Sequence, residues 1–268
     1  EYLACGLDPN KVTIYRQSDV PEVLELYLYL NMNAYLGELE RTTSFKDKAR
    51  QQPNNVNAGL LTYPSLMAAD ILIHKAVKVP VGKDQEQNME MARRFARRFN
   101  TIYQTEYFTE PASWHFGDKA IKIPGLDGSG KMGKSEGNAI YLIDDEKTLT
   151  KKVKRAVTDG GPTEPNSTMP EPIANLFTLL KIASSSETYQ HYLTAYNDCS
   201  IRYGDLKAQL AADLVALTAP IRERILELSS DQEFLNKVAR EGAERARESA
   251  RKTLEEVRHI IGFMPTIR

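Results

Sequence analysis

The spacing of apolar positions in the first part of the chain alternates between two regular patterns. Lys11–Gln17 and Val77–Val81 are short runs rich in β-branched residues, which predict strands. Helical spacing predicts three helices, from Pro21 to about Leu36, from Asn57 to about Lys75, and after Gln85 to about Phe99. Strands that alternate with helices are typical of an α/β fold with a parallel sheet.

The second part of the chain has a different pattern. The short apolar run Ile140–Ile143 predicts one more strand, and Asp144–Thr158 predicts a helix with a lysine-rich outer face. A turn-rich linker follows over Asp159–Pro172. All later apolar patterns are helical, with Pro220 as a predicted kink or break and a last helix from about Phe234 to Ile261.

Two domains are therefore expected: a Rossmann-like α/β domain over residues 1–158 and an all-helical domain over residues 159–268. The chain begins at Glu1 without a methionine, and Glu1–Gly6 resembles the last turns of a helix. We expect elements upstream of Glu1 to be missing, which makes the α/β domain incomplete at its N-terminus.

Composition is ordinary for a soluble globular protein, with 41% hydrophobic and 26% charged residues in 268 and a net charge of −1. No apolar run is long enough to span a membrane, and no signal peptide is present at the front. The two cysteines, Cys5 and Cys199, indicate neither a disulfide framework nor a zinc site, so a reducing cytoplasm is expected. Any contact with nucleic acid must come from local basic patches.

The segment Gly128–Ser135 places Lys131 and Lys134 in a glycine-rich loop suited to a polyphosphate. It matches the P-loop pattern G-x-x-x-x-G-K-S, but the context excludes a P-loop. A P-loop needs a helix that starts at its Lys-Ser, whereas Glu136–Asn138 follows here and leaves no room for a crossover helix. For the loop alone, a solvated surface turn remains the alternative.

Lys131–Ser135 (KMGKS) differs by one letter from the Lys-Met-Ser-Lys-Ser signature of class I aminoacyl-tRNA synthetases. With the other segments below, the chain resembles bacterial-type tryptophanyl-tRNA synthetases over nearly its whole length. The segments that carry the resemblance are Gly37–Arg41, Phe45–Lys48, Tyr63-Pro64, Met67–Leu72, Val79–Gln85, Arg98–Asn100, Lys131–Ser135 and Lys154–Asp159.

This resemblance implies ATP-dependent activation of L-tryptophan and transfer of the acyl group to tRNA(Trp). Lys131 and Lys134 would follow the leaving pyrophosphate, within a nucleotide-binding loop that also contains Met132, Gly133 and Ser135. Gly82, Lys83 and Asp84 would meet the ribose of ATP, and Ile123 would line the adenine through its backbone. Asp84 has a second interpretation as a helix N-cap. Mg²⁺ would enter with ATP and needs no dedicated protein cage, so we predict no metal-binding residues.

Asp70 is a carboxylate among apolar neighbours, which is unfavourable unless something pairs with it. By resemblance it accepts the indole N–H of tryptophan, with Met67 packed on the ring. Tyr63 and Gln85 would hold the ammonium and carboxylate ends of the amino acid. The alternative from the residues alone is an internal salt bridge, for instance to Lys75 or Arg41.

The helical domain resembles the anticodon-binding region of the family, and the family forms homodimers that tRNA spans. The last helix has a basic face, but its interleaved glutamates favour i,i+4 pairs on a solvated surface. The arginines of residues 93–98 are likewise interpreted first as a solvated helix face. The alternatives for function are a tyrosyl enzyme and a non-catalytic RNA-binding or regulatory paralogue.

The family pattern is not complete in this chain. Gly133 replaces the usual serine of the signature, which should loosen the loop. The family's other nucleotide motif, a Thr-x-Gly-Asn segment, is not found. We therefore expect this chain alone to be inactive or impaired in adenylate formation.

Overall fold

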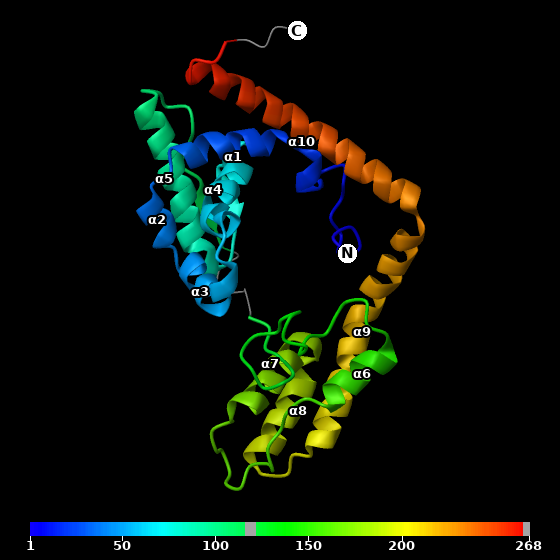
Figure 1. Ribbon diagram of the computed structural model, residues 1–268. Helices are drawn as coiled ribbons and strands as arrows, with labels where there is room; N and C mark the ends of the chain where they lie inside the picture. The colour runs from blue at the N-terminus through cyan, green and yellow to red at the C-terminus, as the bar shows by residue number, and fades with distance from the viewer. Residues whose placement is uncertain (116–121, 265–268) are drawn as a thin grey trace. The chain divides into compact units, whose positions relative to one another are not determined.

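A computed structural model describes residues 1–115 and 122–264, which divide into two compact units (Figure 1). One unit comprises Pro9–Ala120 and Asn236–Arg268, as far as they are described, and is called the α/β unit here. The other comprises the described part of Glu1–Asp8 and Ile121–Leu235, and is called the helical unit.

The α/β unit contains a parallel pair of strands among helices. Strands β1 and β2 pair in register from Lys78 opposite Ala112 to Pro80 opposite Trp114, and helix α5 is the crossover between them. Its core includes Leu26, Leu72 and Phe95, each 1% exposed or less. The elements are α1 (Glu22–Met32), α2 (Leu36–Glu40), α3 (Thr43–Gln51), α4 (Ala58–Leu72), β1 (Lys78–Pro80), α5 (Glu86–Ile102), β2 (Ala112–Trp114) and α10 (Gln232–Ile260), with short 3-10 helices at Gln17–Asp19, Pro53–Asn55 and Lys83–Gln85.

Helices α4 and α5 form where the apolar spacing predicts them. The side chain of Asn57 caps α4 by accepting a hydrogen bond from the backbone N–H of Leu60. Helix α1 ends at Met32, earlier than predicted, because Asn33 turns the chain and its side-chain amide donates to the carbonyl of Tyr29.

The predicted strand at Lys11–Gln17 is wrong. Most of this segment is irregular, and only Gln17 lies in a regular element, the 3-10 helix Gln17–Asp19. A strand needs a neighbour to bond its backbone, and no strand in the described part of the chain pairs with this one. The backbone instead packs on α10, where a Cβ placed on Gly242 would lie 1.9 Å from the carbonyl oxygen of Ile14.

The helical unit is built on α9. Its core contains the inner face of α6, with Leu149 and Val153 buried in one cluster with Leu206 and Leu210 of α9. Helix α9 continues through Pro220, so the predicted break there does not occur. The elements are α6 (Glu146–Lys154), α7 (Glu171–Ala183), α8 (Ser186–Asn197) and α9 (Tyr203–Ser230).

The strand predicted at Ile140–Ile143 is also wrong. The segment is a turn, in which Tyr141 and Asp144 exchange hydrogen bonds: the N–H of Tyr141 donates to Asp144 Oδ2 at 2.9 Å and the N–H of Asp144 donates to the Tyr141 carbonyl at 3.0 Å. A short apolar run does not by itself distinguish a strand from a turn.

The compact units do not follow the predicted boundary between residues 158 and 159. The described residues from 122 to 158 group with α7–α9, and most of α10 groups with the α/β unit. The predicted α/β class, with a parallel sheet and a largely helical remainder, agrees with the structure.

Candidate functional site

The glycine-rich loop of the helical unit is organised by the buried side chain of Asn138. Its amide nitrogen donates to Asp127 Oδ1, Ser129 Oγ and the Lys131 carbonyl, each at 3.0 Å. Its oxygen accepts from the backbone N–H of Gly133 at 2.9 Å. One side chain therefore joins both ends of the loop and satisfies its backbone, which favours one loop conformation.

A close approach of the backbone accounts for the glycine at position 125. A Cβ there would lie 2.2 Å from the amide nitrogen of Asn138 and 2.5 Å from Asp127 Oδ1, closer than real Cβ atoms come. On the other side of the loop, Asn175 of α7 donates to the carbonyls of Gly128 and Ser129 at 3.0 and 3.1 Å. The loop is therefore held from two directions.

Both signature lysines lie exposed on this loop. Lys131 and Lys134 make no ion pair with any described residue, and Ser135 beside them is also exposed. Met132 and Gly133 are half-buried, and the backbone N–H of Met132 donates to the carbonyl of Ile123 at 2.9 Å. The loop therefore presents two free ammonium groups from an ordered backbone, as a polyphosphate site requires.

The turn at Gly82–Gln85 follows β1 in the α/β unit. A Cβ on Gly82 would lie 2.5 Å from Asp84 Oδ1, so the carboxylate sits directly over this glycine. Asp84 is exposed and does not cap α5; the N-cap is Gln85, without a side-chain bond, so the capping alternative is wrong. Lys83 lies in the 3-10 helix Lys83–Gln85, and its side chain lies outside the described part.

Asp70 is half-buried on α4, and its carboxylate has no cationic hydrogen-bond partner among the described residues. The side-chain amide of Gln17 donates to both carboxylate oxygens, at 2.8 and 2.7 Å. Burial raises the pKa of Asp70, against the opposing effects of the Gln17 bond and of nearby His74. The salt-bridge alternative with Lys75 is wrong, because Lys75 pairs with Glu256 at 2.8 Å. No ion pair joins Asp70 to Arg41 either.

The other predicted tryptophan contacts lie partly on the same helix face. Tyr63, Met67 and Asp70 are at i, i+4 and i+7 of α4, which places them in one row. Tyr63 is 51% exposed, with Lys48 Nζ 5.9 Å from its ring centroid. Gln85 is already engaged, since its amide donates to Asp84 at 3.1 Å and its oxygen accepts from Asn88 at 2.8 Å.

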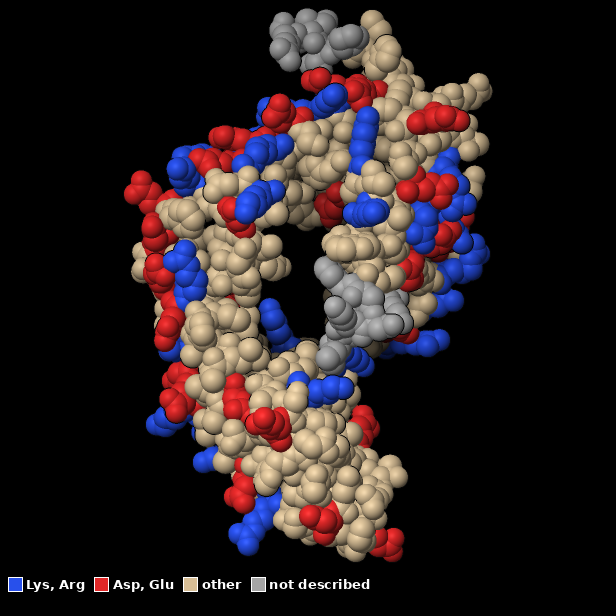
Figure 2. Space-filling view, turned by 180° about the vertical axis from the view of Figure 1, so that it is seen from behind, with Lys and Arg blue, Asp and Glu red and all other residues tan. Residues whose placement is uncertain are grey.

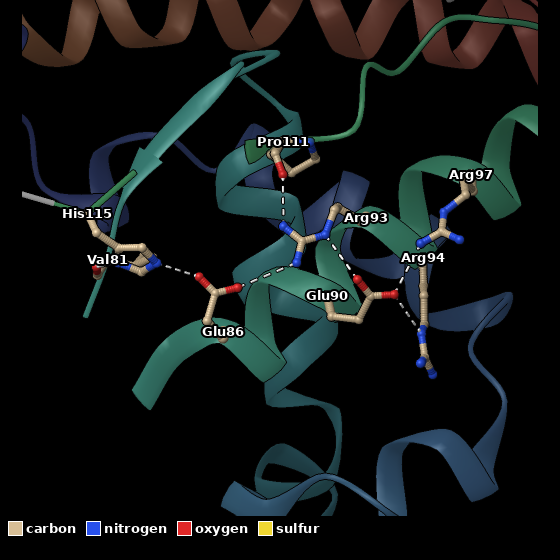
Figure 3. Close-up of polar contacts among 8 residues, drawn as sticks. All are labelled: Val81, Glu86, Glu90, Arg93, Arg94, Arg97, Pro111 and His115. Carbon is tan, nitrogen blue, oxygen red and sulfur yellow. Dashed lines mark hydrogen bonds and ion pairs between the residues drawn. The ribbon is translucent and has the colours of Figure 1, made fainter. Parts of the chain in front are cut away.

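The arginines of α5 are neutralised by glutamates (Figure 3). Glu90 pairs with Arg93, Arg94 and Arg97 at 3.0, 3.3 and 3.1 Å, and Glu86 pairs with Arg93 at 3.6 Å. Arg94 and Arg97 are exposed, as predicted for a solvated helix face, but Arg98 is covered and pairs with Glu38 of α2 at 2.7 Å, so the prediction is wrong for Arg98. A neutralised cluster offers little attraction to a phosphate backbone.

The basic face of α10 is paired across the fold, not mainly along the helix as predicted. Arg247 and Arg251 both reach Glu22 of α1, at 3.1 and 2.9 Å, and Arg258 forms two hydrogen bonds with Glu25. Along α10 itself, Lys237 and Glu241 form an i,i+4 ion pair at 3.9 Å. These arginines fasten α10 to α1.

Acidic and basic side chains are interleaved over the face of the molecule seen in Figure 2, in keeping with the net charge of −1. Within the described residues, no helix is both long and apolar enough to cross a bilayer. No group of three His, Cys, Asp or Glu side chains there could hold a metal ion.

Two contributors to these sites were not predicted from the sequence. From the sequence, Asn138 has no role beyond following the loop, and Gln17 lies at the end of a predicted strand. The Gly-Asn pair at Gly137-Asn138 is a usable signal, because Gly137 has a positive φ of 68° and ends the loop. The contact of Gln17 with Asp70 joins residues far apart in the sequence and has no local signal.

Similarity to known proteins agrees with this geometry. The sequence profile described as "tRNA synthetases class I (W and Y)" matches residues 1–219. A tryptophan–tRNA ligase of Porphyromonas gingivalis is 76% identical over 263 residues, which are 98% of this chain and 80% of that protein.

Solved structures support the same relationship. The tryptophanyl-tRNA synthetase of Campylobacter jejuni in complex with ADP and tryptophan aligns with a TM-score of 0.85 at 35% identity, over 98% of this chain and 80% of that one. The Mycoplasma pneumoniae tryptophanyl-tRNA synthetase aligns with a TM-score of 0.75 at 30% identity, with the same two coverages of 98% and 80%. The chain belongs to the tryptophanyl and tyrosyl family of class I tRNA synthetases.

Proposed function

We propose that the protein activates L-tryptophan with ATP to the aminoacyl-adenylate and transfers the acyl group to tRNA(Trp), with this chain, taken alone, inactive or impaired in adenylate formation. It is 76% identical to a tryptophan–tRNA ligase over 98% of its length, so a tyrosyl enzyme is not favoured. The same identity does not favour a non-catalytic paralogue. One observation in the structure carries the choice of amino acid: Asp70.

Asp70 is suited to receive the indole N–H. It is half-buried, and the hydrogen bond from Gln17 comes from a neutral amide, so its negative charge is not compensated by a bonded cation. A buried acceptor favours a ligand that supplies a donor and disfavours one that leaves the acceptor unpaired. Met67, one turn before it, would pack against the ring, and Tyr63 and Gln85 would hold the ammonium and carboxylate ends.

Activation proceeds by attack of the tryptophan carboxylate on the α-phosphate of ATP, with pyrophosphate as the leaving group. The protein contributes position and charge compensation more than covalent chemistry. Lys131 and Lys134 are free to follow the charge that develops on the pyrophosphate, because no described carboxylate pairs with them. Their loop backbone, held by Asn138, includes Met132, Gly133 and Ser135.

The ATP ribose is assigned to Gly82–Asp84, where the exposed Asp84 carboxylate can accept from sugar hydroxyls and Gly82 allows close approach. Ile123 would line the adenine; its carbonyl already accepts from Met132, so its amide is the group that remains. Mg²⁺ would be bound mainly through the phosphates of ATP, since no described cluster of protein ligands offers it a cage.

The partners in this proposal are L-tryptophan, ATP and tRNA(Trp), in a homodimer located in the cytoplasm. Residues 1–158 are assigned to catalysis and residues 159–268 to anticodon binding. Within that assignment α10 has a structural role, because Arg247, Arg251 and Arg258 are paired with Glu22 and Glu25 of α1.

The test is a pair of calorimetric titrations on Asp70→Ala. Loss of a hydrogen bond to a charged group costs about 1.5–3 kcal/mol, so the Kd for tryptophan should rise roughly 10- to 150-fold while the Kd for ATP is unchanged. Glu110→Gln is the matched control, because it removes a carboxylate of the same unit that pairs with Arg97 at the surface. Equal losses for both ligands in Asp70→Ala would refute the assignment.

A further inference from the structure

An open groove of about 900 Å³ lies along the outer face of α6 in the helical unit, and no role has been assigned to it. Charged and polar side chains line it throughout, with five cations and two carboxylates. The cations are Lys147, Lys151, Lys154, Arg155 and Arg222.

The fold of the helical unit turns the lysines of α6 outward. Leu149 and Val153 are buried in the core of the unit, with 1% and 0% exposure, so the opposite face of α6 is left to solvent. Lys147, Lys151 and Lys154 share that face at i, i+4 and i+7 and are all exposed. A rise of about 1.5 Å per residue spreads them over roughly 10 Å of helix.

Helix α9 adds a cation from the side. Arg222 is half-buried, and its Nε donates to the carbonyl of Ile143 at 3.4 Å, which positions the guanidinium at the groove. Of the two carboxylates, Asp145 caps α6 by accepting from the backbone N–H of Thr148 at 2.7 Å. That carboxylate is therefore partly engaged in holding the helix and compensates the lysines less fully.

The charge state of this groove distinguishes it from the other basic clusters. On α5, Arg93, Arg94 and Arg97 are paired with Glu86 and Glu90, and Arg98 with Glu38. On α10, Arg247 and Arg251 are paired with Glu22, and Arg258 with Glu25. Among the described residues, the three lysines of the α6 face make no ion pair; Lys152, on another side of the helix, pairs with Asp144 at 2.6 Å. The α6 groove therefore carries an excess of positive charge, five cations against two carboxylates, on a protein of net charge −1.

The lining also indicates the kind of anion. It has no aromatic side chain on which a base could stack and no glycine-rich turn to enclose a terminal phosphate. Lysines spaced along a helix, joined by arginines, suit consecutive phosphates of a polynucleotide, which fix position without reading sequence. We propose that the α6 groove binds the phosphodiester backbone of tRNA; this rests on the function proposed above and adds a contact surface to it.

The test measures tRNA binding by the double variant Lys151→Gln/Lys154→Gln. Fluorescence anisotropy gives the Kd at a series of salt concentrations. Each lost phosphate contact reduces the slope of log Kd against log salt by about 1, so the slope should fall by about 2. At 0.1 M salt the Kd should rise at least roughly tenfold, and equally for tRNA(Trp) and a non-cognate tRNA, because the contact is to the backbone. Lys151→Arg/Lys154→Arg should keep most of the affinity.

Lys181→Gln is the control, since it removes an exposed charge of the same unit from α7, away from the lining of the groove. The Kd for L-tryptophan is measured in parallel on every variant. If the slope were unchanged in the double variant while tryptophan still bound, the proposal that the α6 groove binds tRNA would be overturned and the proposed function would stand. A loss confined to tRNA(Trp), or an equal loss in Lys181→Gln, would also overturn it. Absence of tryptophan binding in the unmodified chain would refute the proposed function instead.

Discussion

Replacement of Gly242 by alanine should destabilise the α/β unit, although the same change in most helices is stabilising. Gly242 lies inside α10, where alanine normally gains about 1 kcal/mol over glycine. In this structure the added Cβ would lie 1.9 Å from the carbonyl oxygen and 2.8 Å from the carbonyl carbon of Ile14. The obstacle is backbone, so no side chain can rotate out of the way.

The size of the effect follows from these distances. Real Cβ atoms essentially never come closer than 3.0 Å, so helix and segment must separate by roughly 1.1 Å at this contact. Overpacking of this kind costs about 1–3 kcal/mol, and sometimes more, which exceeds the gain in helix propensity. We expect a net loss of up to about 2 kcal/mol, or a melting temperature lower by up to about 8 °C for a unit of this size.

Differential scanning calorimetry measures this directly, with Gly59→Ala as the matched control. Gly59 lies in the first turn of α4 in the same unit, and its added Cβ would meet only Asn57 Oδ1 at an ordinary 3.4 Å. That variant should be neutral or more stable by up to about 1 kcal/mol. If Gly242→Ala were stabilised as much as Gly59→Ala, the close approach of Ile14 to α10 would be disproved. The displaced segment leads to Gln17, whose amide donates to Asp70. The affinity for tryptophan should therefore also fall in Gly242→Ala, but not in Gly59→Ala.

Three further predictions concern the loop and the α1–α10 contact. Asn138→Ala should leave the hydrogen-bonding partners of Asn138 unsatisfied, at a cost of about 1–3 kcal/mol in stability. Amide hydrogen exchange at Gly133 should become faster and ATP binding weaker, and unaltered protection at Gly133 would contradict this. Lys134→Gln should weaken ATP but not tryptophan binding in titrations, and a parallel loss of both would show that the lysine acts through folding. The hydrogen bonds from Arg258 hold the pKa of Glu25 below its ordinary 4.5. The stabilisation from these bonds is therefore present above about pH 4.5 and is lost as the pH falls through the lowered pKa. In Glu25→Gln the melting temperature should depend less on pH over that range. If the melting temperature of the variant fell with acid as much as that of the unmodified chain, the Arg258–Glu25 pair would not be its cause.

The elements that could be predicted are those whose stabilisation is local. Helices α4 and α5 follow from apolar spacing and, for α4, from the Asn57 cap, and both appear where expected. The strand at Lys11–Gln17 could not be judged locally, because a strand exists only when a second one bonds to it. Its backbone contact is instead with Gly242, more than two hundred residues away in the sequence.

The candidate site divides in the same way. The exposure of Lys131 and Lys134 was predictable because an unpaired lysine is almost never buried, whereas the loop conformation depends on Asn138 and on Asn175 of α7. The isolation of Asp70 from cations was not, since it depends on Lys75 being occupied by Glu256. The pairing of Arg258 with Glu25 was missed for the same reason: local charge patterns suggested glutamates one turn away, whereas the fold brought α1 closer. The roles assigned to the individual site residues stay predictions.

The α/β unit is built from two separate stretches of the chain, which affects when it can fold during synthesis. The ribosome delivers residues 122–235 as one uninterrupted stretch, so the helical unit can complete its own core while translation continues. Leu254 and Val257 of α10, by contrast, are core residues of a unit whose other segments emerged much earlier. Until they arrive, the part of this core that α10 completes stays open to solvent, and exposed apolar surface makes the nascent chain prone to aggregation.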